Sequence, residues 1–179
     1  MNLRIIQMNL TKNRYYFEAL DNYPYCIQEC VEALNYALSY NPEDADTLCL
    51  MGRLHAEVLK DYETAKAYFS EAMKYDLMNI SIPHFYISCL LSNEDYEEAE
   101  KLIAYALKLK GVNKAGILLQ NAVLMERKGN IKKALRIVAK AKELSFDQNM
   151  MNLLEERKKF LKGKRPKKSG KGRKKKETK

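Results

Sequence analysis

Few side chains in this sequence have the types and spacing that metal binding requires. Cys26 and Cys30 lie four residues apart, which would place both thiols on one face of a helix. Structural zinc sites place cysteines as close pairs of the C-x-x-C kind, often with histidines, and the sequence holds no such pair. We therefore interpret the four cysteines as free, buried thiols and predict no metal ion and no cofactor.

The remaining reactive side chains do not form a catalytic set. His55 is expected on the packed face of its helix, and His84 falls in the first turn of another helix without an evident partner. The acidic pairs at 97–98 and 155–156 have lysines nearby, which is typical of solvated helix surface. Catalysis needs several reactive groups that converge on one place, so we predict that the protein is not an enzyme.

Positive charge is concentrated at the C-terminal end of the chain. The 179 residues carry a formal net charge of +9. Residues 163–179 hold ten Lys and Arg and one acidic residue, whereas residues 1–162 hold 22 basic and 22 acidic residues. This balance argues against a globally basic nucleic-acid-binding domain. Because Gly, Pro, Ser and like charges bury little apolar surface, we expect 163–179 to be a disordered basic tail.

We expect the tail to bind polyanions with little specificity, either RNA or DNA or an anionic membrane surface. It also fits a solubilising role or, in a cell with a nucleus, an import signal. Its candidate polyanion-binding residues are Lys164, Arg165, Lys167, Lys168, Lys171, Arg173, Lys174, Lys175 and Lys176.

A segment that recurs about every 34 residues dominates the rest of the chain. At an offset of 34, Ala65 aligns with Ala99 and Phe69 with Ile103. In each copy, small, large and small residues follow at i, i+4 and i+7, so they share one helical face on which another helix can pack closely. Shorter helical segments separate the copies, which predicts antiparallel helix pairs repeated head to tail. The copies are 25–42, 60–76, 94–110 and 129–145, and the segments between them are 45–59, 82–92 and 114–128.

This organisation resembles the tetratricopeptide repeat (TPR). The resemblance covers about 25–145 and is best in 45–78, where one extra residue is expected in the turn. There the consensus slots are filled by Leu48, Gly52, Tyr62, Ala65, Phe69 and Ala72. In the later copies, Pro83 and Ile117 replace the aromatic residue of the first helix, and Ile87 and Asn121 replace its glycine.

The resemblance implies an all-α fold, a right-handed α-solenoid of antiparallel helix pairs with a C-terminal capping helix. We expect a leading segment with a partial helix over 1–24, helical repeats over 25–146, a capping helix over 147–162, and the tail. The longest uncharged stretch, 77–93, contains Pro83 and several polar residues and is too short to span a membrane. A cytoplasmic location is therefore the expectation.

In TPR proteins the first helix of each pair lines a concave groove that usually holds a peptide or a partner's helix. Transferred by slot, the groove residues here are Asp46, Cys49, Arg53, Glu57, His84, Ser88, Leu91, Leu118, Ala122 and Met125. This set predicts a partner segment with an apolar anchor, with Arg53 meeting a carboxylate or a backbone carbonyl. In the alternative interpretation, Leu118 and Met125 pack under the terminal helix.

The resemblance therefore favours a non-catalytic scaffold or adaptor that binds a protein partner. The carboxylate clamp that some members use for chaperone C-termini is absent, because its places hold residues such as Tyr15, Ala19 and Cys49. The alternative function is an RNA- or ribosome-associated helical-repeat protein that binds nucleic acid mainly through the basic tail.

Overall fold

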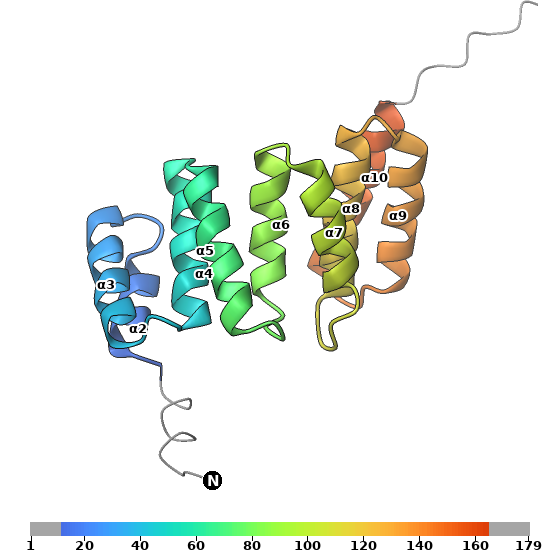
Figure 1. Ribbon diagram of the computed structural model, residues 1–179. Coiled ribbons are helices and arrows are strands. Elements are labelled where there is room, and N and C mark those ends of the chain that lie inside the picture. Colours follow the sequence, from blue (N-terminus) through green and yellow to red (C-terminus); the bar gives the residue numbers. More distant parts are fainter. Residues whose placement is uncertain (1–11, 165–179) are drawn as a thin grey trace, which may run out of the picture.

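The computed structural model describes residues 12–164 and shows helix pairs standing side by side in one row (Figure 1). Within these residues every regular element is helical, which confirms the predicted all-α solenoid. The elements are α2 (Arg14–Asn22), α3 (Ile27–Tyr40), α4 (Ala45–Arg53), η1 (Leu54–Leu59), α5 (Tyr62–Tyr75), α6 (Ile82–Ser92), α7 (Tyr96–Ala106), α8 (Lys114–Arg127), α9 (Ile131–Glu143) and α10 (Gln148–Gly163).

Short polar side chains determine where most of these helices begin. The carboxylates of Asp44, Asp61 and Asp147 accept hydrogen bonds from backbone N–H groups in the first turns of α4, α5 and α10. Asn113 and Asn130 do the same for α8 and α9. These caps satisfy N–H groups that have no partner within their own helix, so each repeat restarts at a defined residue.

The helices form two layers. The first helices of successive pairs pack on one another, as α4 does on α6 and α6 on α8, and α10 continues this layer by packing on α8. Each second helix instead packs mainly on the helices next to it in sequence. We call α2, α4, α6 and α8, together with α10, the inner layer.

Recurring small–large–small slots build the core between the layers. Ala65, Phe69 and Ala72 of α5 are fully buried, as are the corresponding Ala134, Val138 and Ala141 of α9. The Phe69 ring occupies the space beside Gly52 of α4. A Cβ atom added to this glycine would lie 3.0 Å from that ring. The glycine is therefore required by the close approach of two helices.

The extra residue of the 45–78 repeat lies inside its first helix and not in the turn. Residues with left-handed backbone, Lys60, Glu94 and Gly129, precede the small residues at 65, 99 and 134 by the same interval, so the turns match. The helix ends instead in the π-helix η1, Leu54–Leu59. A π-turn accommodates one more residue than an α-turn, which keeps the register of the turn that follows.

The last helix covers the end of the array. Leu154 and Leu161 of α10 are fully buried in the same cluster as Leu118 and Val138. This is the role that a terminal helix has in repeat proteins. Among residues 12–164, none of the helices has the length and apolar character needed to cross a membrane. Residues 1–11 of the expected leading segment 1–24 and residues 165–179 of the expected tail 163–179 lie outside the described residues.

Candidate functional site

Arg53 is the centre of a polar cluster on the inner layer. Its guanidinium carbon lies 4.1 Å from the ring centroid of Phe85 on α6 and 4.7 Å from that of Tyr23, which follows α2. Its Nε atom lies 3.5 Å from a carboxylate oxygen of Glu57. Two rings from neighbouring repeats thus hold one half-buried cation, an arrangement that fixes its position and leaves donors free on the open side.

Tyr23 and Glu57 complete this cluster. The Tyr23 hydroxyl donates a hydrogen bond to the Glu57 carboxylate. Burial, together with this hydrogen bond, raises the pKa of Tyr23 above its ordinary value, so the hydroxyl remains a donor at neutral pH. These contacts join the ends of α2, α4 and α6 and so fix the arrangement of the side chains on this surface.

The neighbouring polar group links α6 to α8. The Gln120 side-chain amide donates to the backbone carbonyl of His84 and to the Ser88 hydroxyl, at 2.8 Å each. The Gln120 Oε1 atom is buried and has no hydrogen-bond partner among the described residues. Burial lowers the pKa of His84, which favours a neutral imidazole at pH 7. The group therefore places two exposed polar side chains, His84 and Ser88, beside a buried amide.

An apolar cleft of about 380 Å³ lies between α8 and α10. Leu119 and Val123 of α8 and Leu153 and Phe160 of α10 form its walls. About half of the Phe160 and Leu153 surface is exposed, although both are large apolar residues. A cleft with an exposed apolar wall is the usual form of a site for an apolar side chain.

Charged groups frame the cleft. Glu126 of α8 is largely buried and pairs with both Arg157 and Lys164. The ammonium of Lys164 lies 4.5 Å from the centroid of the Phe160 ring. Lys164 is thus the one residue of the predicted polyanion-binding set that the described part of the chain includes, and it is engaged at the rim of the cleft.

The structure separates the groove residues expected from the sequence into exposed and buried groups. Glu57, His84 and Ser88 are exposed, and Asp46 and Arg53 are half-buried. Cys49 and Leu91 are buried, and burial raises the pKa of the Cys49 thiol to about 12. Leu118, Ala122 and Met125 are also buried, with at most 4% of their surface exposed.

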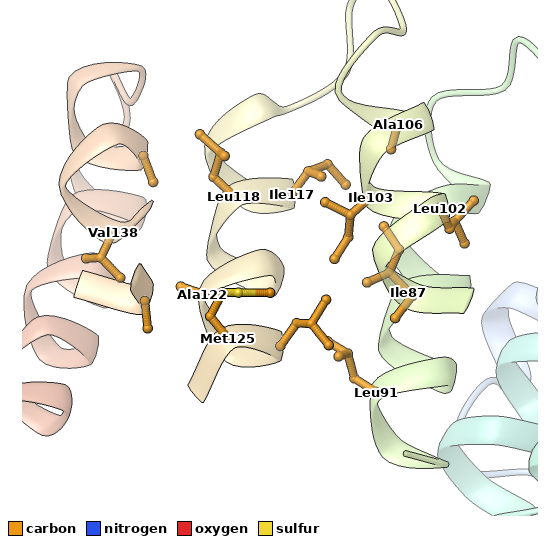
Figure 2. Packing of buried hydrophobic residues seen from close by; sticks show 14 of the residues in the cluster. Ile87, Leu91, Leu102, Ile103, Ala106, Ile117, Leu118, Ala122, Met125 and Val138 are labelled. Atoms are coloured by element: carbon orange, nitrogen blue, oxygen red, sulfur yellow. The ribbon is translucent and has the colours of Figure 1, made fainter. Parts of the chain in front are cut away.

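Figure 2 shows Leu118 and Ala122 on the side of α8 that faces Val138 of α9. Leu118, Ala122 and Met125 of α8 therefore belong to the core. Leu118 and Met125 share a cluster with Leu154 and Leu161, as in the alternative in which they pack under the terminal helix.

A one-residue difference in spacing explains this displacement. The accessible positions of α6 are 84, 85 and 88. The corresponding positions of α8 are 119, 120 and 123, an offset of 35, and of these 119 and 123 line the cleft. An offset of 34 from α6 leads instead to the buried positions 118 and 122. The missed residues, Leu119, Gln120 and Val123, would have been found from the 35-residue spacing between Ala99 and Ala134.

The metal-ligating side chains of the described residues are dispersed. Within residues 12–164, no group of three or more His, Cys, Asp or Glu side chains is arranged to hold a metal ion. His55 packs against the Tyr68 ring, with the ring centroids 5.4 Å apart. The chemistry on the inner layer is thus that of hydrogen-bond donors and acceptors beside an apolar cleft.

No protein-family model and no curated protein sequence matches the chain. Solved structures are similar in fold. PilF of Pseudomonas aeruginosa superposes with a TM-score of 0.70 at 17% identity, covering 84% of this chain and 71% of that one. TTC0263, a TPR protein of Thermus thermophilus, gives 0.69 at 15% identity, covering 88% and 85%.

A third similar structure is YrrB, described as a TPR protein with an unusual peptide-binding site. It gives a TM-score of 0.65 at 19% identity, covering 79% of this chain and 73% of that one. The repeated helix pairs, the recurring small–large–small slots and these likenesses together lead to one conclusion. The chain has the fold of the tetratricopeptide-repeat proteins.

Proposed function

We propose that the protein is a non-catalytic scaffold whose inner layer binds an extended segment of a partner protein. The observation that supports this most directly is the combination of two features on one layer. A prearranged cation, Arg53, lies on α4, and an apolar cleft lies between α8 and α10. A peptide that runs along the layer would meet both.

Each part of the surface has a distinct task in this proposal. Arg53 would donate to a carboxylate or a backbone carbonyl of the partner. An apolar side chain of the partner would fill the cleft beside Val123 and Phe160. YrrB, which has the same fold, is described as having a peptide-binding site, and this agrees with a peptide as ligand.

The polybasic tail would supply a second, less specific contact with anionic partners. Nine of its ten cations follow Lys164 and lie outside the described residues. This part of the proposal rests on composition and on the position of Lys164 at the rim of the cleft.

Selection from a random peptide library tests the inner layer directly. Peptides that bind the full-length protein should share an apolar residue and should bind at least about tenfold more weakly to the double variant Arg53→Glu, Leu119→Glu. Affinity is measured by isothermal titration calorimetry, and circular dichroism checks that the variant is folded.

The matched control is Lys74→Glu, Leu77→Glu, which makes the same change in charge and polarity at exposed positions outside the inner layer. It should bind the selected peptides like the unmodified protein. If both double variants lose affinity equally, or if neither does, the inner layer is not the binding surface.

A further inference from the structure

Charge is distributed very unevenly along the folded array. Residues 12–95 contain 6 Lys and Arg against 14 Asp and Glu, a net charge of −8. Residues 96–164 contain 16 Lys and Arg against 8 Asp and Glu, a net charge of +8. The near-zero charge of the folded part therefore hides an acidic half and a basic half, and the basic half is the one from which the tail departs.

The outer face of α9 is the most uniform part of the basic half. Its buried residues, Ala134, Val138 and Ala141, all face the core. Its exposed residues are four cations, one alanine and Glu143 at its C-terminal end. The cations are Lys132, Lys133, Arg136 and Lys140, which lie at i, i+1, i+4 and i+8 and so share one side of the helix.

Two lysines of α10 extend this surface. Glu155 of α10 pairs with Lys142 of α9, which shows that this side of α10 borders α9. Lys159 and Lys162 follow Glu155 at i+4 and i+7 on the same side of α10, and both are exposed. We call the four cations of α9 and these two lysines the cationic face. Within residues 12–164, the ion pairs of α8, α9 and α10 use Lys128, Lys142, Arg157 and Lys164, so the six cations of the cationic face stay available.

The composition of the cationic face indicates its ligand. A protein interface would need an apolar or aromatic centre, and a membrane-binding helix would need large apolar residues. Among the exposed residues of α9, alanine is the largest apolar side chain. Binding to single strands would need aromatic side chains on which bases stack, and α9 has none. A surface made of Lys and Arg without large apolar or aromatic side chains is suited to binding phosphate groups.

We propose that the cationic face of α9 and α10 binds the phosphate backbone of double-stranded nucleic acid. Because phosphate contacts do not read bases or sugars, duplex RNA and duplex DNA should bind comparably and without sequence preference. The acidic half repels the same ligand, so contact is confined to the last repeat. This surface is separate from the inner layer, and its ligand belongs to a different class from the proposed protein partner.

The test uses the full-length protein, so the tail is present in every sample. Binding of a fluorescent RNA duplex of about 20 base pairs is measured by anisotropy between about 50 and 200 mM salt. The quadruple variant Lys132→Gln, Lys133→Gln, Arg136→Gln, Lys140→Gln should bind roughly tenfold or more weakly. Its slope of log affinity against log salt should be less negative by about 3 to 4, since each phosphate contact contributes about 0.9.

The matched control removes the same charge elsewhere in the basic half. Lys101, Lys108, Lys110 and Lys114 are exposed and lie on or beside α7 and the start of α8. Changing these four to Gln should leave the salt slope within about 1 of the unmodified protein. Circular dichroism and binding of a library-selected peptide check that both variants are folded.

Several results would overturn the proposal. Unchanged duplex binding by the α9 variant would assign the affinity to the tail alone. Equal loss in both quadruple variants would mean that net charge and not this face is responsible. Loss of binding to phosphatidylserine vesicles, with duplex binding retained, would assign the face to membranes. If a DNA duplex bound weakly and an RNA duplex strongly, the expectation that the two duplexes bind comparably would be wrong.

Discussion

At the scale of single residues, Asp44 shows how one carboxylate joins two segments. It caps α4 by accepting from the Thr47 N–H group and pairs with Lys12 at 2.8 Å. Burial by itself would raise the pKa of Asp44, but hydrogen bonds from Lys12 and Thr47 outweigh burial and hold this pKa below its ordinary value. A carboxyl group with a depressed pKa stabilises the folded state above the unfolded-state pKa of about 4 and loses this effect as the pH falls through its folded-state pKa.

Lys12→Gln should therefore weaken the dependence of stability on pH. Without the ammonium group the pKa of Asp44 should rise towards its ordinary value, and the free energy of unfolding should fall less steeply as the pH drops below about 4. Urea unfolding at several pH values measures this slope, and carboxyl-carbon NMR measures the pKa. The exposed Lys74→Gln is the control. A pKa for Asp44 that does not move would show that the Thr47 contacts hold it alone.

The residues of the inner layer also show which contacts can be predicted from positions within one repeat. Arg53 and Glu57 share a helix, so their proximity follows from the sequence alone. The contacts of Arg53 with Tyr23 and Phe85 join three helix pairs and depend on how the pairs stack. No spacing within one repeat encodes such a contact, and so both aromatic residues were missed.

At the scale of elements, the approach of α4 to α5 depends on Gly52. Because a Cβ atom there would lie 3.0 Å from the Phe69 ring, Gly52→Ala should force the two helices apart. We expect a loss of about 1 to 3 kcal/mol in the free energy of unfolding, which is typical of overpacked cores. Urea unfolding measures this loss.

Gly163→Ala is the matched control for Gly52→Ala. An added Cβ atom at Gly163 meets no atom within 4 Å, so this variant should be neutral or slightly more stable through helix propensity. If the two substitutions change the free energy of unfolding equally, helix propensity and not contact with Phe69 determines the effect of Gly52→Ala.

Periodicity predicted the helices well because each slot makes the same contact in every copy. It failed where a copy gains or loses one residue. The π-helix η1 absorbs an inserted residue within the helix, and the 35-residue offset of α8 moves its open face to Leu119 and Val123. One residue along a helix corresponds to a rotation of about 100°, so an error of one position exchanges accessible and buried positions.

At the scale of the whole molecule, the net charge of the chain does not show how the charge is distributed along it. The balanced charge of residues 1–162 predicted a neutral scaffold, yet the two halves differ in sign. Composition cannot detect this difference, because a sum over the chain discards order. The TPR-like fold converts order along the sequence into position along the array, so the sequence halves become the two ends of the molecule (Figure 1).

The same linear arrangement predicts how the molecule unfolds. Leu161 of α10 is fully buried, and α10 packs on α8 and α9. Leu161→Ala should reduce stability by about 2 to 5 kcal/mol at this end, because it leaves a cavity under the last helix.

In an array whose repeats contact only their neighbours, this loss should remain local. Hydrogen exchange followed by mass spectrometry should show faster exchange in α8, α9 and α10 and little change in α3 and α5. Leu153→Ala, at a residue 47% exposed on the same helix, should change exchange far less. Uniform acceleration in all helices after Leu161→Ala would instead mean that the array unfolds as a single cooperative unit, and that its ends are energetically coupled.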